Sequence, residues 1–456
     1  MRSLRFSRWG CGAAGIYPEN RWEETYSDRG GNLPYWLNGV IPLAFQLRPL
    51  SDSVDSTGYN LTSVVVSYMR RLVANQHAGG FPIHNNFNLG TWNVVRSSLL
   101  LMSAAPGERA LLLPFVMGYI SAAHARLKSS GFGEDLVCTE CDQRHRNCST
   151  IPGGGVCVGS RSVSQFDREC SLANRESATV QRFRYPDWMH ILQDLLDSHS
   201  DEMTEAERSL VFEHMQLVGD WGFNYRAFYS RPCDANESDT VCFPIGSCNS
   251  AREAEHNECK PPAWHATDAL DTPAVHGVHG AAMAYKEGTV RWRMTREQRD
   301  AELDELKIST LERFHGQPTG QFSADECLAG REAARGVELC TIVETMYSLG
   351  IMGQNGSVSR VDRLERIALN SLPAALTADV SAATPFLALF CPRSQPRCCR
   401  SQMWAHNYLS MINEVQAEQS PRHPWGDGEN ATTYGLADRF TGVTPCCTAN
   451  HNQGCA

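Results

Sequence analysis

The residues with the clearest chemical potential are thiols and carboxylates in the last third of the chain. Glu338 and Cys340 stand two residues apart, just before a helical pattern that begins near Thr341. In an extended lead-in to that helix both side chains would project to one side, so they could share one ligand. Cys446 and Cys447 are adjacent thiols at a proline-directed turn and could both reach one ion. Together these residues would form a four-ligand set of three sulfurs and one oxygen.

Zinc is the metal that such a set would hold. Soft thiolates select zinc or copper over magnesium and calcium, and zinc accepts a tetrahedral set of mixed ligands. The interval between Cys340 and Cys446 matches no zinc-finger spacing. From the residues alone, therefore, disulfide bonding of Cys446 and Cys447 is the favoured alternative.

An acidic pair and a histidine could also take part in chemistry. Glu326 follows Asp325 and precedes Glu338 by twelve residues. Such pairs are most often solvated surface groups, but a carboxyl with a raised pKa in apolar surroundings could act as a general acid. His276 lies at the start of an Ala-rich helical stretch, where it is either a core residue or a neutral hydrogen-bonding group that faces a pocket.

Helices are the elements expected to position these groups, because strand-like alternation is scarce. Thr204 is expected to cap one helix, and Gly350 is expected to end another. A chain of repeated helix pairs predicts a mainly α fold, namely a helical toroid or (α/α) barrel whose centre collects loop residues into a pocket. Apolar residues recur at three- and four-residue intervals in about eleven segments: 39–47, 64–73, 97–103, 110–127, 188–196, 204–218, 269–285, 296–314, 341–349, 361–376 and 403–415.

Composition and charge narrow the class of protein. The chain has 456 residues, of which 42% are hydrophobic and 20% charged, so it can bury a large core. Its formal charge of -10 and the lack of a Lys/Arg block predict no nucleic-acid partner. The best apolar stretch, residues 110–120, contains Pro114 and falls short of about 18 residues, so no membrane span is expected.

Eighteen cysteines favour an oxidising compartment. Five lie within 138–170 and four within 233–259, in segments rich in turn-forming residues, which predicts disulfide-stapled loops. Five glycosylation sequons fit a secretory route, although residues 1–30 show no apolar signal-peptide region. The expected organisation is an N-terminal segment, 1–30, and a barrel domain, 31–456, with insertions at about 135–175, 233–262 and 381–402.

Five segments, in order along the chain, resemble glycoside hydrolase family 127, the β-L-arabinofuranosidase family, and its uncharacterised relatives. They are residues 33–44 (LPYWLNGVIPLA), 184–188 (RYPDW), 276–278 (HGV), 337–344 (VELCTIVE) and 445–450 (PCCTAN). The resemblance implies an (α/α)6 barrel followed by β-sandwich domains. Since the chain ends at Ala456, soon after the last motif, the β-sandwich is expected to be absent, and the 381–402 segment interrupts a stretch that relatives carry as continuous.

The resemblance also assigns roles to individual residues. The zinc ligands would be Glu338, Cys340, Cys446 and Cys447. Cys446 would be the nucleophile that attacks the anomeric carbon. Glu326 would be the general acid and base, with Asp325 as the second choice, and His276 would line the sugar site.

The expected activity is that of a glycoside hydrolase, acting with retention on β-L-arabinofuranosides or a related glycan through a zinc-bound cysteine. Two other classes stay open. One is a catalytically inactive extracellular carbohydrate-binding barrel, which oxidised Cys446 and Cys447 would favour. The other is a polysaccharide lyase, since lyases also use helical toroids and leave unsaturated sugar products.

Overall fold

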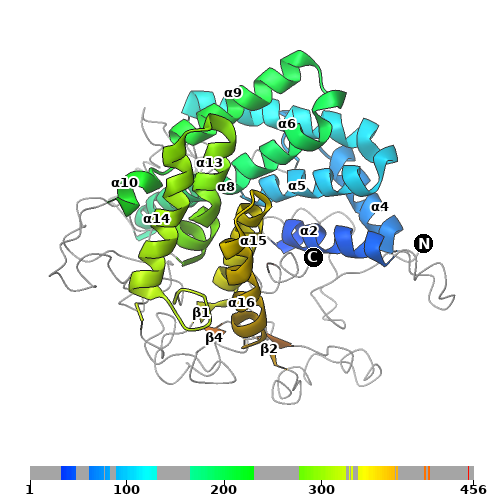
Figure 1. The fold of residues 1–456 in the computed structure, drawn as a ribbon. Helices are drawn as coiled ribbons and strands as arrows, with labels where there is room; N and C mark the ends of the chain where they lie inside the picture. The colour runs from blue at the N-terminus through cyan, green and yellow to red at the C-terminus, as the bar shows by residue number, and fades with distance from the viewer. Residues whose placement is uncertain are drawn as a thin grey trace. The chain divides into compact units, whose positions relative to one another are not determined.

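Helices dominate the described part of the chain, which confirms the mainly α prediction for those residues (Figure 1). The structure is a computed structural model. It describes residues 32–47, 61–76, 78–82, 89–130, 165–230, 277–324, 328, 330–331, 337–374, 376–377, 405–406, 409–410 and 450. The strands among them are two residues long and pair antiparallel: β1 (Val337–Glu338) with β4 (Leu409–Ser410), and β2 (Leu376–Thr377) with β3 (Ala405–His406).

The chain divides into two compact units. The N-terminal unit consists of Leu33–Phe228, Val290–Glu297 and Cys455–Ala456. The C-terminal unit consists of Met1–Asn32, Tyr229–Thr289 and Gln298–Gly454. Glu338 and Cys340, the described members of the predicted zinc site, belong to the C-terminal unit.

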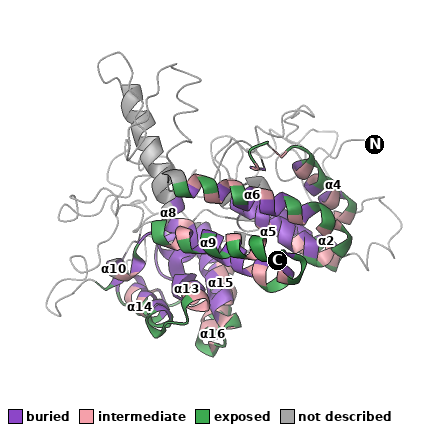
Figure 2. Cartoon of the chain, turned by 90° about the horizontal axis from the view of Figure 1, so that it is seen from above, coloured by how far each residue is buried: buried purple, intermediate pink, exposed green. Residues whose placement is uncertain are grey.

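In the N-terminal unit, helices that are buried along most of their length alternate with amphipathic ones. Helix α5 packs against α8, and both are buried along most of their described lengths (Figure 2). Helix α9 buries one stripe only, Val211, His214, Met215 and Val218, and packs against α8 and α6. The helices are α2 (Asn32–Gln46), α4 (Leu61–Ala74), α5 (Leu89–Ala104), η1 (Pro106–Glu108), α6 (Arg109–Ser130), α8 (Gln165–His199), η2 (Ser200–Glu202), α9 (Glu205–Trp221) and α10 (Tyr225–Tyr229).

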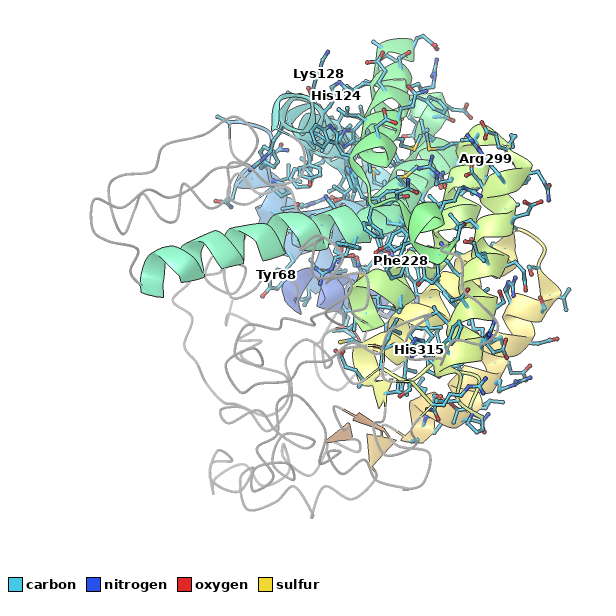
Figure 3. The ribbon with its side chains drawn as sticks, turned by 90° about the vertical axis from the view of Figure 1, so that its left-hand side faces the viewer. Tyr68, His124, Lys128, Phe228, Arg299 and His315 are labelled. Atoms are coloured by element: carbon cyan, nitrogen blue, oxygen red, sulfur yellow. The ribbon has the colours of Figure 1, made fainter. Side chains whose placement is uncertain are left out.

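An aromatic cluster fills the core of this unit. Trp188 stacks on Trp92 with ring centroids 5.9 Å apart and meets the edge of Tyr119 at 5.5 Å. The indole N–H of Trp188 donates to Nε2 of His214 at 2.8 Å, so the neutral imidazole carries its own proton on Nδ1. His214 also lies 5.7 Å from His124 of α6, which is labelled in Figure 3. Burial lowers the pKa of His214 to about 3.

The C-terminal unit repeats the alternation. Helix α15 (Leu339–Gln354) is buried at most positions, whereas α16 (Val358–Ala374), which packs against it, buries only Ile367 and Ser371. A π-helix, η5 (Gly277–Ala282), continues into η6 (Met283–Lys286), and both pack against α15. Helix α14 (Gln298–His315) packs against η6 and buries both apolar residues, such as Leu303 and Leu311, and charged ones. Helix α13 (Glu287–Thr295) begins in this unit and ends in the other.

A buried charge cluster joins α13 to α14. Lys307, which is fully buried, donates to the Ala284 carbonyl at 2.6 Å and lies 3.3 Å from carboxylate oxygens of both Glu287 and Asp304. Asp304 accepts from the backbone N–H groups of the first turn of α13 at Gly288 (2.7 Å) and Thr289 (2.6 Å). Burial raises the pKa of Asp304, and Lys307 and Thr289 oppose that rise.

Local signals placed some helix ends correctly and others wrongly. The Thr204 cap is confirmed, because its hydroxyl accepts from the Glu207 N–H at 3.2 Å while the Glu207 carboxylate accepts from the Thr204 N–H at 2.8 Å. The prediction that Gly350 ends its helix is wrong, because α15 continues to Gln354. Gly356, two residues after the helix end, has a φ of 91°.

Two longer segments also differ from expectation. Residues 405–406 and 409–410 form strands inside the predicted helix 403–415. Helix α8 begins at Gln165, so residues 165–175 of the first predicted insertion are helical. Segments 233–262 and 381–402, and the side chains of the clustered cysteines, lie outside the described residues, so the insertions there, the disulfides and the secretory route stay predictions.

One helix in the described part meets the length and composition of a membrane span. It is Pro106–Lys128, and half of its most apolar window is buried inside the protein. Helix α6, which makes up most of this segment, packs against α4 and α9, as the core helix of a globular protein also would. The absence of a membrane span stays a prediction.

Candidate functional site

The Glu-x-Cys motif lies where β1 passes into α15. Glu338 is extended, with φ −65° and ψ 139°, and Leu339 begins the helix. The expectation of an extended lead-in is therefore right for Glu338 and wrong for Cys340, which lies in the first helical turn. Both side chains are nevertheless buried, with exposed fractions of 3% and 4%. A carboxylate and a thiol two residues apart are thus both buried in the interior of the C-terminal unit.

The segment that leads to the acidic pair runs beside this motif. Ala324 forms a parallel bridge with Val337, and its carbonyl oxygen accepts from the Glu338 N–H at 2.8 Å. Asp325 and Glu326 follow Ala324 directly in the sequence and lie outside the described residues. On its other side, β1 pairs with β4, so that Glu338 lies opposite Leu409.

A tight turn at residues 317–321 precedes the segment that contains Ala324. The N–H of Gln317 donates to the Gln321 carbonyl at 2.7 Å, and the N–H of Gly320 donates to the Gln317 carbonyl at 3.0 Å. Gly320 has a φ of 90°, and a Cβ there would lie 2.9 Å from Cδ of Arg366. Nε of Arg363 donates to the Gly320 carbonyl at 2.9 Å. Glycine is required here because both the φ and the approach of α16 exclude a side chain.

A polar stripe runs along the buried face of α15. Thr341, Thr345 and Ser348 follow one another at four- and three-residue spacing and are at most 1% exposed. The Thr345 hydroxyl donates to the Thr341 carbonyl at 2.7 Å, and the Ser348 hydroxyl donates to the Ala282 carbonyl at 2.7 Å. The ammonium group of Lys286, fully buried, lies 3.3 Å from the Ser348 oxygen. Hydroxyls at helical spacing in an apolar helix are the sequence signal for this stripe, which was not predicted.

His315, at the C-terminal end of α14, is another residue that the sequence analysis missed (Figure 3). Its ring is fully buried, and Nδ1 accepts from the backbone N–H of Gly330 at 2.9 Å. The neutral imidazole therefore carries its proton on Nε2. Its backbone carbonyl also accepts from the Ser323 N–H at 2.7 Å. His315 thus ties the chain on both sides of the acidic pair to α14.

Of the predicted site residues, the structure describes Glu338 and Cys340. The others lie outside the described residues: His276, Asp325, Glu326, Cys446 and Cys447. Near two of them the neighbouring chain is described. Gly277 and Val278, which follow His276, begin the π-helix that packs against α15. Asn450, three residues after Cys447, is buried in the same unit.

The two described residues of the predicted zinc site, Glu338 and Cys340, fit zinc by their chemistry. A buried carboxylate and a buried thiol are donors that zinc accepts, and the interior position of both suits a structural or catalytic metal rather than a hydrated surface ion. Within the described ranges no cluster of three or more His, Cys, Asp or Glu side chains could hold a metal. Cys446 and Cys447 are outside those ranges, so the four-ligand set stays a prediction.

No family model, curated protein or solved structure matches this chain. The resemblance to glycoside hydrolase family 127 therefore rests on the five sequence segments alone.

Proposed function

We propose that the chain is a glycoside hydrolase of the family 127 type, which cleaves β-L-arabinofuranosides or a related glycan with retention. The observation that carries this proposal is the hydrogen bond from the Glu338 N–H to the Ala324 carbonyl, 2.8 Å long. Glu326 is two residues beyond Ala324, and two residues span at most about 7 Å. The segment that leads to the proposed proton donor therefore runs beside the Glu-x-Cys motif at Ala324, which supports the proposal.

In this proposal Glu338, Cys340, Cys446 and Cys447 hold a zinc ion. When bound, zinc keeps the cysteine deprotonated at neutral pH and stabilises the thiolate as a leaving group. Cys446 Sγ attacks the anomeric carbon while the Glu326 carboxyl donates its proton to the departing glycosidic oxygen. The Glu326 carboxylate then takes a proton from the water that releases the sugar from the sulfur, which restores both groups.

We also propose that the fold is the (α/α)6 barrel. Support comes from the alternation of buried and amphipathic helices within each unit. In the N-terminal unit the buried helices α5 and α8 pack on each other, and the amphipathic α9 packs on α6. In the C-terminal unit the buried α15 packs on η5 and η6, and α16 covers one side of it. In a toroid of helix pairs, buried inner helices line the centre and amphipathic outer helices pack on them, as α16 packs on α15 and α9 packs on α8.

The experiment uses the full chain, purified with its metal content measured, and 4-nitrophenyl β-L-arabinofuranoside as substrate. Cys446→Ser should lower kcat by about a thousandfold or more, because a serine hydroxyl stays protonated and binds zinc poorly. The chain has a second pair of adjacent cysteines, Cys398 and Cys399, and Cys398→Ser is the matched control, which should keep turnover. Glu326→Gln should slow alkyl glycosides by about 10²- to 10⁴-fold and activated aryl glycosides far less.

Three results would overturn the proposal. Normal turnover by Cys446→Ser would exclude the cysteine nucleophile. Unsaturated products would identify a lyase. Sugar binding without zinc or turnover, with Cys446 and Cys447 oxidised, would identify a carbohydrate-binding protein.

A further inference from the structure

Two buried oxygens beside the Glu-x-Cys motif have no hydrogen-bond partner among the described residues. They are Oε1 of Gln321 and Oγ1 of Thr341. Both residues have an exposed fraction of 0%. In native proteins nearly all buried polar side-chain atoms have a hydrogen-bond partner, because a buried polar atom without one lowers the free energy of unfolding. Gln321 and Thr341 are joined through the Thr345 hydroxyl, so a single bound group can supply the missing partner of both oxygens.

The orientation of the Gln321 amide follows from its neighbours. The Thr345 hydroxyl has one hydrogen, and it donates this hydrogen to the Thr341 carbonyl at 2.7 Å. Toward Gln321 it can therefore only accept, and the group 3.0 Å away must be the amide nitrogen, Nε2. Oε1 of Gln321 is thus the amide atom that remains free to accept a hydrogen bond. The Thr345 hydroxyl bonds both the Gln321 amide nitrogen and the Thr341 carbonyl.

The place of the two oxygens relates them to the proposed chemistry. Thr341 follows Cys340 in the first turns of α15. Gln321 belongs to the segment whose Ala324 carbonyl is bonded to the Glu338 N–H. Gln321 Oε1 is a pure acceptor, and Thr341 Oγ1 both donates and accepts. A neutral alcohol group, which also donates and accepts, complements this pair.

We propose that Gln321 and Thr341 bind a hydroxyl group of a neutral sugar unit and determine which sugar the site accepts. This inference rests on the proposed function for the presence of a carbohydrate at Glu338 and Cys340. Gln321 Oε1 accepts a hydrogen bond from the sugar hydroxyl, and Thr341 Oγ1 donates one to it. A site that pairs a substrate hydroxyl in this way rejects analogues that lack it, because its own polar groups are then left unmet.

The test compares Thr341→Val and Gln321→Leu with Ser348→Ala in the full chain. Ser348 is the matched control: its hydroxyl is buried on the same helix, but it is bonded inside the protein to the Ala282 carbonyl. Melting temperature separates structural from binding roles. Thr341→Val should keep or raise the melting temperature, since a methyl group replaces an unmet hydroxyl, whereas Ser348→Ala should lower it.

Binding is measured by calorimetry with L-arabinose, D-xylose and D-galactose, and with monodeoxy analogues of the sugar that binds. For Thr341→Val and Gln321→Leu, Kd and KM should each rise about tenfold, with a smaller change in kcat, and Ser348→Ala should bind as the wild type does. One deoxy sugar should bind weakly to the wild type and lose nothing further in Thr341→Val, because the same hydrogen bond is already missing.

The outcomes separate the two proposals. Hydrolysis with sugar affinities unchanged in both variants overturns this inference alone and indicates that buried water meets the two oxygens. Sugar binding that depends on Thr341 and Gln321, without hydrolysis, supports this inference and overturns the proposed activity. Failure of all the tested sugars to bind the wild type overturns this inference, whatever the turnover assay gives.

Discussion

Acid should destabilise the N-terminal unit through His214, which is buried in the aromatic core. Burial lowers the pKa of His214 to about 3, with a smaller contribution from His124, whereas an unfolded histidine titrates near 6.5. Between these values the unfolded chain binds the proton and the native chain does not. The stabilisation is therefore fully present above about pH 6.5 and is lost as the pH falls toward 3.

The size of the loss in unfolding free energy follows from the difference between the pKa of His214 in the unfolded and the native chain. Each pH unit below 6.5 costs about 1.4 kcal/mol of unfolding free energy, so the loss at pH 5 is about 2 kcal/mol. The variant His214→Gln removes the titration and keeps an acceptor for the Trp188 N–H, which lies 2.8 Å from the imidazole in the native protein.

Urea unfolding at pH 7.5, 6.5 and 5.0, followed by tryptophan fluorescence, measures the effect. Between pH 7.5 and 5.0 the wild type should lose about 2 kcal/mol more than His214→Gln. Every other titrating group is common to both proteins, so the difference isolates this histidine. Stability curves that run parallel for the two proteins over this range would refute the reasoning.

Two further predictions concern stability. Lys307→Met should lower the unfolding free energy by about 3–5 kcal/mol, because Glu287 and Asp304 would keep buried charges without their cation. The exposed Lys128 is the control, and Lys128→Met should change it by less than about 0.5 kcal/mol; equal effects in urea unfolding would contradict the assignment. Thr204→Ala should cost about 1 kcal/mol and Thr204→Ser much less, since serine retains the capping oxygen. A Ser variant as unstable as the Ala variant would show that the cap contributes nothing.

Sequence signals predicted a structural feature correctly where that feature depends on neighbouring residues only. The Thr204 cap depends on residues within one turn, and its capping box has the predicted geometry. The extension of α15 past Gly350 shows the limit of such signals: packing of this helix against α16 outweighs the cost of one glycine.

Features that depend on distant segments were beyond the sequence. The strands at 405–406 and 409–410 form because the chain pairs there with β2 and β1, which no periodicity within 403–415 reveals. The site shows the same division. The Glu-x-Cys motif was visible as residue types, but the partner of Glu338 is the Ala324 carbonyl, and only the folded chain brings them together. Gln321 carried no signal because the orientation of its amide depends on Thr345, which is 24 residues away.

The turn at Gly320 has a consequence for how substitutions in this chain should be interpreted. Helix α16 buries little of its surface, so its side chains would ordinarily be treated as tolerant of replacement. Yet Arg363 bonds the Gly320 carbonyl, and Arg366 occupies the space that a side chain at 320 would need. In a saturation mutagenesis screen, substitutions of Arg363 and Arg366 should therefore be as poorly tolerated as substitutions in the site. Among natural variants, position 320 should co-vary with positions 363 and 366.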